Sequence, residues 1–137
     1  MIVEIISGLW IGNLSEFTNT QFMSDNLISV IFNCTLSHTI ANTNNQQHIR
    51  IPVSDLNEPS SDFALLKQNL PKIIQFIHSN IDEKNICIVG YDNFTIPLII
   101  CSIYMMKYGD IKKDMIQTIL QSKYKGFHLQ HDLSYFM

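Results

Sequence analysis

The stretch between one apolar segment and the helix expected after it is where this sequence could most readily place chemistry. Residues 86–89 form a continuous apolar run, typical of a strand buried on both faces, and Pro97 suits the first turn of a following helix. In such a strand–loop–helix unit, loop N–H groups and the helix N-terminus converge on one point and favour an anion. An enzyme that transfers phosphate would add a nucleophile and a cation to this loop. The nine residues at this place, Val89, Gly90, Tyr91, Asp92, Asn93, Phe94, Thr95, Ile96 and Pro97, include no cysteine and no Lys, Arg or His.

Three cysteines are the remaining candidate nucleophiles, namely Cys34, Cys87 and Cys101. Their number is odd, and no two of them have the C-x-x-C spacing of a redox or zinc site. Each lies in an apolar run, where a thiol is inert and packs as a small hydrophobic group. We therefore expect reduced, buried cysteines in an intracellular protein.

Clusters of histidines and carboxylates give weaker indications. His128 and His131 are three residues apart and could share a helix face as metal ligands, but Asp132 is the only further candidate ligand nearby. We therefore expect an ordinary surface pair, and we expect no metal and no cofactor. We expect a solvated acidic loop, and no pair of catalytic carboxylates, at Asp55, Glu58 and Asp62.

Composition and charge limit the class of protein. The chain has 137 residues, 46% of them hydrophobic and 15% charged, which suits a single domain over residues 1–137. Nine Lys and Arg against 12 Asp and Glu give a net charge of -3, so neither nucleic acid nor an anionic membrane is an expected partner. A mild basic spot near the C-terminus could steer an acidic partner, although ordinary surface is the simpler interpretation; its lysines are Lys112, Lys113, Lys123 and Lys125.

No segment is expected to cross a membrane, because the longest uncharged apolar run, Ile96–Met106, is about half the ~20 residues that a span needs. Glu4, with no basic stretch before it, argues against a secretory signal, so a cytoplasmic location is expected.

The chain has 22 isoleucines, 12 asparagines and two alanines, which is typical of an AT-rich coding sequence. Such sequences occur in parasites and large DNA viruses, and for a virus the location would be the host cytoplasm.

Apolar periodicity predicts strands that alternate with helices. Strands are expected at residues 2–6, 8–13, 27–33, 49–53 and 86–89. Helices are expected at residues 15–26, 61–77, 98–107 and 112–122, with Pro71 producing either a kink or two abutting helices. The aromatic tail, residues 127–136, is expected to dock on the core. This order favours an α/β sandwich, in which a sheet with parallel pairs is covered by helices.

Several short segments match one family's motifs in their order and spacing. Gly8–Asn13 is similar to an L-Y-L-G element, with Trp10 at the Tyr. The other matches are Val30–Asn33 for a first long strand, Ile51–Asp55 for an I-P-x-x-D segment, Phe76-Ile77 for the helix before a catalytic strand, Ile86–Val89 for the strand V-L-V-H, and Leu98–Lys107 for a helix that ends in Y-L-M. Together these segments resemble the dual-specificity phosphatases of the cysteine-dependent protein phosphatase superfamily. The resemblance runs from Ile5 to Phe136 and implies a central mixed or parallel sheet of four to five strands, flanked by helices.

The catalytic loop departs from the family's motif, which is H-C-x-x-G-x-x-R followed by Ser or Thr. Gly90 stands at the nucleophilic Cys and has no side chain to attack phosphorus, so no phosphoenzyme can form. Ile96 stands at the Arg and removes the bidentate clamp on the phosphate oxygens, while Asp92 would repel a dianion. The remaining correspondences are Val89 at the His, Asn93 at the Gly and Pro97 at the hydroxyl residue.

Asp55 stands where the family has its general acid. We do not carry that role over, because an acid with no leaving group has nothing to protonate. A loop aspartate that accepts hydrogen bonds from nearby backbone N–H groups is the simpler interpretation of this relic position.

The resemblance therefore implies a pseudophosphatase, a catalytically inactive protein that acts through protein–protein contacts as an interaction or scaffold module. The sequence does not identify the protein partner, and a homodimer is left open. Contacts are expected in the loop, where an exposed Tyr and Phe could anchor an interface, at Tyr91, Asp92, Asn93, Phe94 and Thr95. The alternative for the loop is that Phe94 and Ile96 simply fill the vacated pocket.

Two other functions are weighed against this one. The first is a module that binds phosphate or phosphoproteins without turnover, using only the N–H groups of the degenerate loop 90–96 and of the helix that follows. The second is an enzyme of a different chemistry. Binding of a phosphotyrosine peptide separates the first from an interaction module, and a phosphatase assay separates the second.

Overall fold

The computed structural model describes residues 2–15, 20–35, 39–40, 46–51, 53, 60–129 and 131–137. Its strands are β1 (Ile2–Ile6), β2 (Leu9–Asn13), β3 (Ile28–Asn33), β4 (Gln47–Arg50) and β5 (Asn85–Gly90). Its helices are α1 (Thr20–Asp25), α2 (Ser60–Asn80), α3 (Thr95–Tyr108), α4 (Lys113–Lys123) and the 3-10 helix η2 (Leu133–Phe136).

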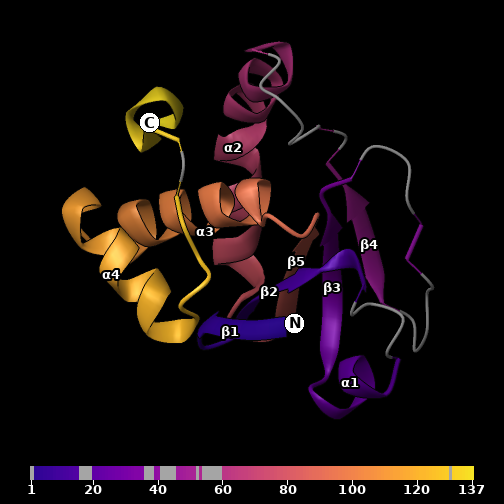
Figure 1. Ribbon diagram of the computed structural model, residues 1–137. Helices are drawn as coiled ribbons and strands as arrows, with labels where there is room; N and C mark the ends of the chain where they lie inside the picture. The colour runs from indigo at the N-terminus through magenta and orange to yellow at the C-terminus, as the bar shows by residue number, and fades with distance from the viewer. Residues whose placement is uncertain are drawn as a thin grey trace.

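The strands form one mixed five-stranded sheet in the order β1-β2-β5-β3-β4. β1 is antiparallel to β2, whereas the pairs β2–β5, β5–β3 and β3–β4 are parallel. Figure 1 shows α2, α3 and α4 gathered on one side of this sheet, with α1 lying beside β3 away from them. The prediction of an α/β sandwich built on a mixed sheet is confirmed.

β5 is the central strand, and it is buried on both faces as its apolar sequence predicts. Side chains alternate along a strand, so Ile86 and Ile88 enter the large core beneath α2 and α3, while Cys87 and Val89 enter a smaller cluster on the opposite face with Met23 of α1. Gly90, the next residue, is therefore directed to the α3 face of the sheet.

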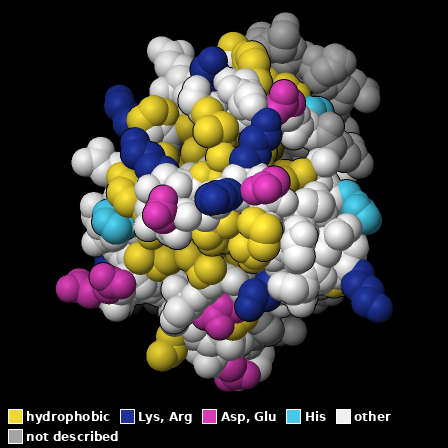
Figure 2. Space-filling model, turned by 90° about the vertical axis from the view of Figure 1, so that its left-hand side faces the viewer, with side chains coloured by type: hydrophobic (Ala, Val, Ile, Leu, Met, Phe, Trp, Pro, Cys, Tyr) yellow, Lys and Arg dark blue, Asp and Glu magenta, His cyan; other side chains and the backbone are white. Residues whose placement is uncertain are grey.

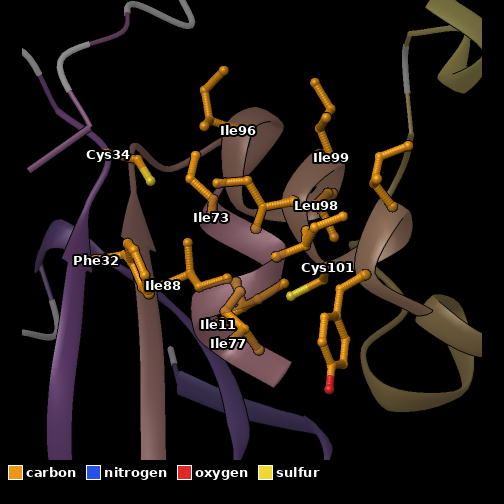
Figure 3. Packing of buried hydrophobic residues seen from close by; sticks show 14 of the residues in the cluster. Ile11, Phe32, Cys34, Ile73, Ile77, Ile88, Ile96, Leu98, Ile99 and Cys101 are labelled. Carbon is orange, nitrogen blue, oxygen red and sulfur yellow. The ribbon is translucent and has the colours of Figure 1, made fainter. Parts of the chain in front are cut away.

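The large core fills the space between the sheet and the three longer helices. In Figure 3, Ile11, Phe32 and Ile88 on the strands lie opposite Ile77 of α2 and Leu98 of α3. α3 is buried along nearly its whole length, from Thr95 to Met105, as its apolar sequence predicts. The aromatic tail docks on the same core, since Phe127 is fully buried and Phe136 is 5% exposed.

Several element bounds differ from the sequence expectations; α3, for example, begins at Thr95 rather than at residue 98. Of the two alternatives for Pro71, a kink or two abutting helices, the second is wrong, because α2 passes through Pro71 as a single helix; the apolar residues on either side of Pro71 pack against the core and hold the turns together. The strand expected at residues 49–53 is instead β4, Gln47–Arg50, because its register is set by parallel pairing with β3. In the part of the chain that the structure describes, no helix is long and apolar enough to cross a membrane.

Candidate functional site

The carboxyl ends of four strands meet at one edge of the sheet, which is where open α/β sheets bind ligands. Asn13 at the end of β2 pairs with Gly90 at the end of β5, and Val89 pairs with Asn33 of β3. Asn33 in turn pairs with Arg50, the last residue of β4. The loop from residue 91 to residue 94 leaves this edge and leads directly into α3, so the fold positions the sequence-predicted loop as expected.

The loop is closed by hydrogen bonds to its own atoms. The N–H of Phe94 donates to the carbonyl oxygen of Tyr91 at 2.9 Å, and the N–H of Thr95 donates to Oδ1 of Asn93 at 3.2 Å. The N–H of Leu98 donates to the carbonyl oxygen of Phe94, and Pro97 has no N–H to offer. The N–H groups of Phe94, Thr95 and Leu98 are therefore already engaged, and Pro97 has none to offer an anion.

Gly90 and Pro97 fit against each other so closely that no side chain has room at residue 90. An ideal Cβ placed on Gly90 would lie 2.7 Å from both Cδ and Cγ of Pro97, well inside van der Waals contact. The pyrrolidine ring is rigid, and Gly90 is itself buried at the end of the central strand. A cysteine at residue 90 would overlap the proline ring unless the backbone moved.

Phe94 and Ile96 are buried, which corrects the expectation of an exposed aromatic pair in the loop. Phe94 is 7% exposed and packs edge-on against Phe127 and Tyr124, with ring centroids 5.2 and 6.5 Å away. Ile96 is fully buried in the large core, among the residues drawn in Figure 3. The physical reason is the apolar cover supplied by residues 124–127, and the alternative that these two side chains fill the pocket is the one that the packing supports.

The other loop residues divide by exposure. Asp92 and Asn93 are exposed and Tyr91 is half-buried, whereas Thr95 is 8% exposed and Val89 is fully buried. Thr95 is thus a second expected contact residue that the structure places inside. Phe94 also has a φ of 58°, in the left-handed region that disfavours a side chain, so its burial is accompanied by backbone strain.

A polar group beside the loop was not expected from the sequence. Thr35 Oγ1 donates to Oδ1 of Asn33 at 2.6 Å, and Arg50 Nη1 donates to the carbonyl oxygen of Thr35 at 2.8 Å. Arg50 is the only arginine of the chain. Its guanidinium thus binds the segment after β3. β4 brings Arg50 to this edge as its last residue, whereas the sequence pattern predicted a strand at residues 49–53.

All three cysteines are reduced and fully buried, as predicted. Burial raises the pKa of the Cys87 thiol well above its usual value, with the thiols of Cys101 and Cys34 adding to the effect. Burial likewise raises the pKa of Cys101. A thiolate is the reactive form of cysteine, so these groups have neither the access nor the ionisation that a nucleophile needs.

The histidines and carboxylates singled out in the sequence do not converge. His131 packs edge-on against Phe63 with centroids 4.8 Å apart, and His128 Nδ1 lies 3.2 Å from Gln121 Nε2. Asp132 forms an ion pair with Lys113 at 3.0 Å. Among the described residues, no group of three His, Cys, Asp or Glu side chains could hold a metal ion. Asp55, Glu58 and the side chain of Asp62 lie outside the described part of the chain.

No model of a protein family matches the chain, and no curated protein matches it. Solved structures do match it over nearly its whole length. DUSP15 is 18% identical, with 98% of this chain and 83% of that chain covered and a TM-score of 0.82. Human DUSP28 is 12% identical, with 98% and 88% covered and a TM-score of 0.83.

A third match is the human tyrosine phosphatase-like serine/threonine/tyrosine-interacting protein. It is 12% identical, with 98% of this chain and 91% of that chain covered and a TM-score of 0.78. At such identities the likeness concerns the fold. The chain therefore has the α/β fold of the dual-specificity phosphatases, as its sequence resemblance implies.

Proposed function

We propose that this chain is a pseudophosphatase, a catalytically inactive protein with a dual-specificity phosphatase fold that acts as a protein interaction module. The loop that follows the central strand of this fold carries Gly90 where the family motif has its nucleophilic Cys and Ile96 where it has its Arg. Neither residue can attack phosphorus or bind its oxygens. The buried thiols and the engaged guanidinium of Arg50 offer no replacement for them.

The observation that carries the proposal is the contact between Gly90 and Pro97. If only the nucleophile were missing, space for its side chain would remain at residue 90. Here the ring of Pro97 occupies that space. Phe94 and Ile96 occupy the surrounding volume as core residues. The loop is therefore packed as structure, and this packing supports a role for the chain that needs no reaction at the loop.

The hydrogen bonds of the loop argue against the second candidate, a module that captures phosphate at the same place. Anion sites at helix N-termini depend on unengaged N–H groups. Here the N–H of Thr95 donates to Asn93, the N–H of Phe94 donates to Tyr91, and Pro97 has none. Exposed Asp92 adds a negative charge beside any anion that approached.

A phosphatase assay tests the inactive character of the protein. The purified chain and an active dual-specificity phosphatase are compared with para-nitrophenyl phosphate over the same range of concentrations. We expect turnover from the active enzyme and none above buffer from this chain. Turnover that survives purification to homogeneity and that is abolished by Asp55→Asn would contradict the proposal, because it would show a working general acid.

Isothermal titration with a phosphotyrosine peptide tests the phosphate-binding alternative. We expect no saturable heat for the wild-type chain. Saturable binding that shifts the amide resonances of residues 91–96 would favour that alternative instead.

The interaction role is tested by affinity purification from the native cell type, followed by reconstitution of a complex from two purified proteins. Failure of every candidate partner to bind in reconstitution would contradict it.

A further inference from the structure

An apolar groove lies between α2 and α3, with η2 at its side. It has a volume of about 400 Å³, within the range of sites that bind ligands or peptide side chains. Figure 2 shows hydrophobic side chains gathered over this side of the molecule, with both Lys or Arg and Asp or Glu side chains among them. The apolar lining consists mainly of Leu70, Pro71, Ile74, Ile103, Met106 and Phe136.

Two exposed lysines line the same groove, Lys67 from α2 and Lys107 from the last turn of α3. Each ammonium group lies over an aromatic ring, at 4.9 Å from the Tyr135 ring centre for Lys67 and 5.9 Å from that of Tyr108 for Lys107. Among the described residues, neither lysine has an Asp or Glu partner, and none lines the groove. The groove is thus apolar inside and positively charged at its margin.

We infer that this groove binds a short peptide segment of a protein partner, in which two or three neighbouring apolar side chains are flanked by Asp or Glu. The apolar side chains enter the groove, and the carboxylates pair with Lys67 and Lys107. This inference rests on the proposed role as an interaction module and names its surface. A fatty acid would satisfy the apolar lining but has one carboxylate for two lysines, so a peptide with two acidic side chains fits the groove more completely.

Selection from a phage-displayed library of random 12-residue peptides tests the inference. The wild-type chain is the target, and selected peptides are then measured by fluorescence anisotropy. We expect sequences with clustered apolar residues beside Asp or Glu. We expect at least a tenfold loss of affinity in the double variant K67E/K107E, because two attractive charges become repulsive. The control K84E/K125E changes the net charge equally at exposed lysines outside the groove, and it should bind within twofold of wild type.

The location of binding is read from amide resonances. Shifts at Leu70, Ile103 and Phe136 support the inference, whereas shifts confined to residues 91–93 overturn it while leaving the interaction role intact. Selected peptides that lack acidic residues, or that bind K67E/K107E as well as wild type, also overturn it. Two further results count against it: laurate that displaces every selected peptide with higher affinity, and self-association of the chain that is lost in K67E/K107E. Phosphatase turnover would instead refute the proposed function.

Discussion

The loop after β5 and the groove between α2 and α3 differ in what each leaves available to a ligand. The loop lies where this fold places chemistry, yet the N–H groups of Phe94 and Thr95 and the space beside Gly90 are taken by its own residues. The groove lies where the fold places no chemistry, yet it is open, apolar and lined by two lysines without carboxylate partners among the described residues. The comparison shows that the place of a segment in the fold indicates a binding site only when its hydrogen-bond donors and the space around it are still available to a ligand.

The variant expected to have the largest effect on the packed loop is Ile96→Arg, which places a guanidinium at a fully buried position. We expect it to destabilise the protein by about 3–5 kcal/mol, the cost of an uncompensated buried charge. Ile96→Val is the control, with an expected loss of about 0.5–1.5 kcal/mol. Urea denaturation measures both. If Ile96→Arg costs less than its control, the loop is open enough to let the guanidinium reach water.

Phe94→Ala tests whether the aromatic cover of the loop is structural. Loss of the contacts with Phe127 and Tyr124 should cost about 3 kcal/mol, since Phe94 is nearly fully buried. Phe94→Gly loses the same contacts but suits the φ of 58°, so it should be about 1 kcal/mol more stable than Phe94→Ala. Thermal and urea unfolding give both values. An alanine variant as stable as wild type would mean that the ring contributes no packing.

Gly90→Ala measures the contact with Pro97. The added methyl would lie 2.7 Å from the ring, and we expect a loss of about 1–3 kcal/mol from overpacking. In a Pro97→Ala background the same change should cost less, with a coupling of at least about 1 kcal/mol in the double-mutant cycle. Additive losses would show that the two residues do not compete for one space.

The smallest effect concerns the segment beside the groove. Hydrogen bonds from the Ser134 N–H and from Lys113 hold the pKa of Asp132 below its usual value and tie η2, which carries Phe136, to α4. A lowered folded-state pKa contributes stability above the unfolded-state value, and this stability is lost as the pH falls through the folded-state value. We therefore expect Asp132→Asn to remove a small part of the acid sensitivity of unfolding. Identical pH profiles for both proteins would contradict this.

The fold could be predicted because its strongest patterns are local. Continuous apolar residues in β5 and the nearly all-apolar sequence of α3 determine two buried elements, and the strands around them follow from alternation with helices. β4 was misplaced because Gln47–Arg50 has no apolar alternation, and only pairing with β3 fixes it. The α2 helix continued through Pro71 because tertiary packing outweighed one lost hydrogen bond.

The candidate site was predictable in its location but not in its packing. The sequence shows which residues occupy the loop, and the loop lies at the expected edge of the sheet. It does not show that Phe94 turns inward, because its cover comes from Tyr124 and Phe127, which are distant in sequence. The groove could not be predicted at all, since its wall is assembled from three separate elements.

The close fit of Gly90 and Pro97 has a consequence for the order in which these two positions can change. A side chain at residue 90 is accommodated more readily after the ring at residue 97 has been lost, because the reverse order passes through an overpacked intermediate. Substitutions at the two positions are therefore expected to be tolerated in one order better than in the other.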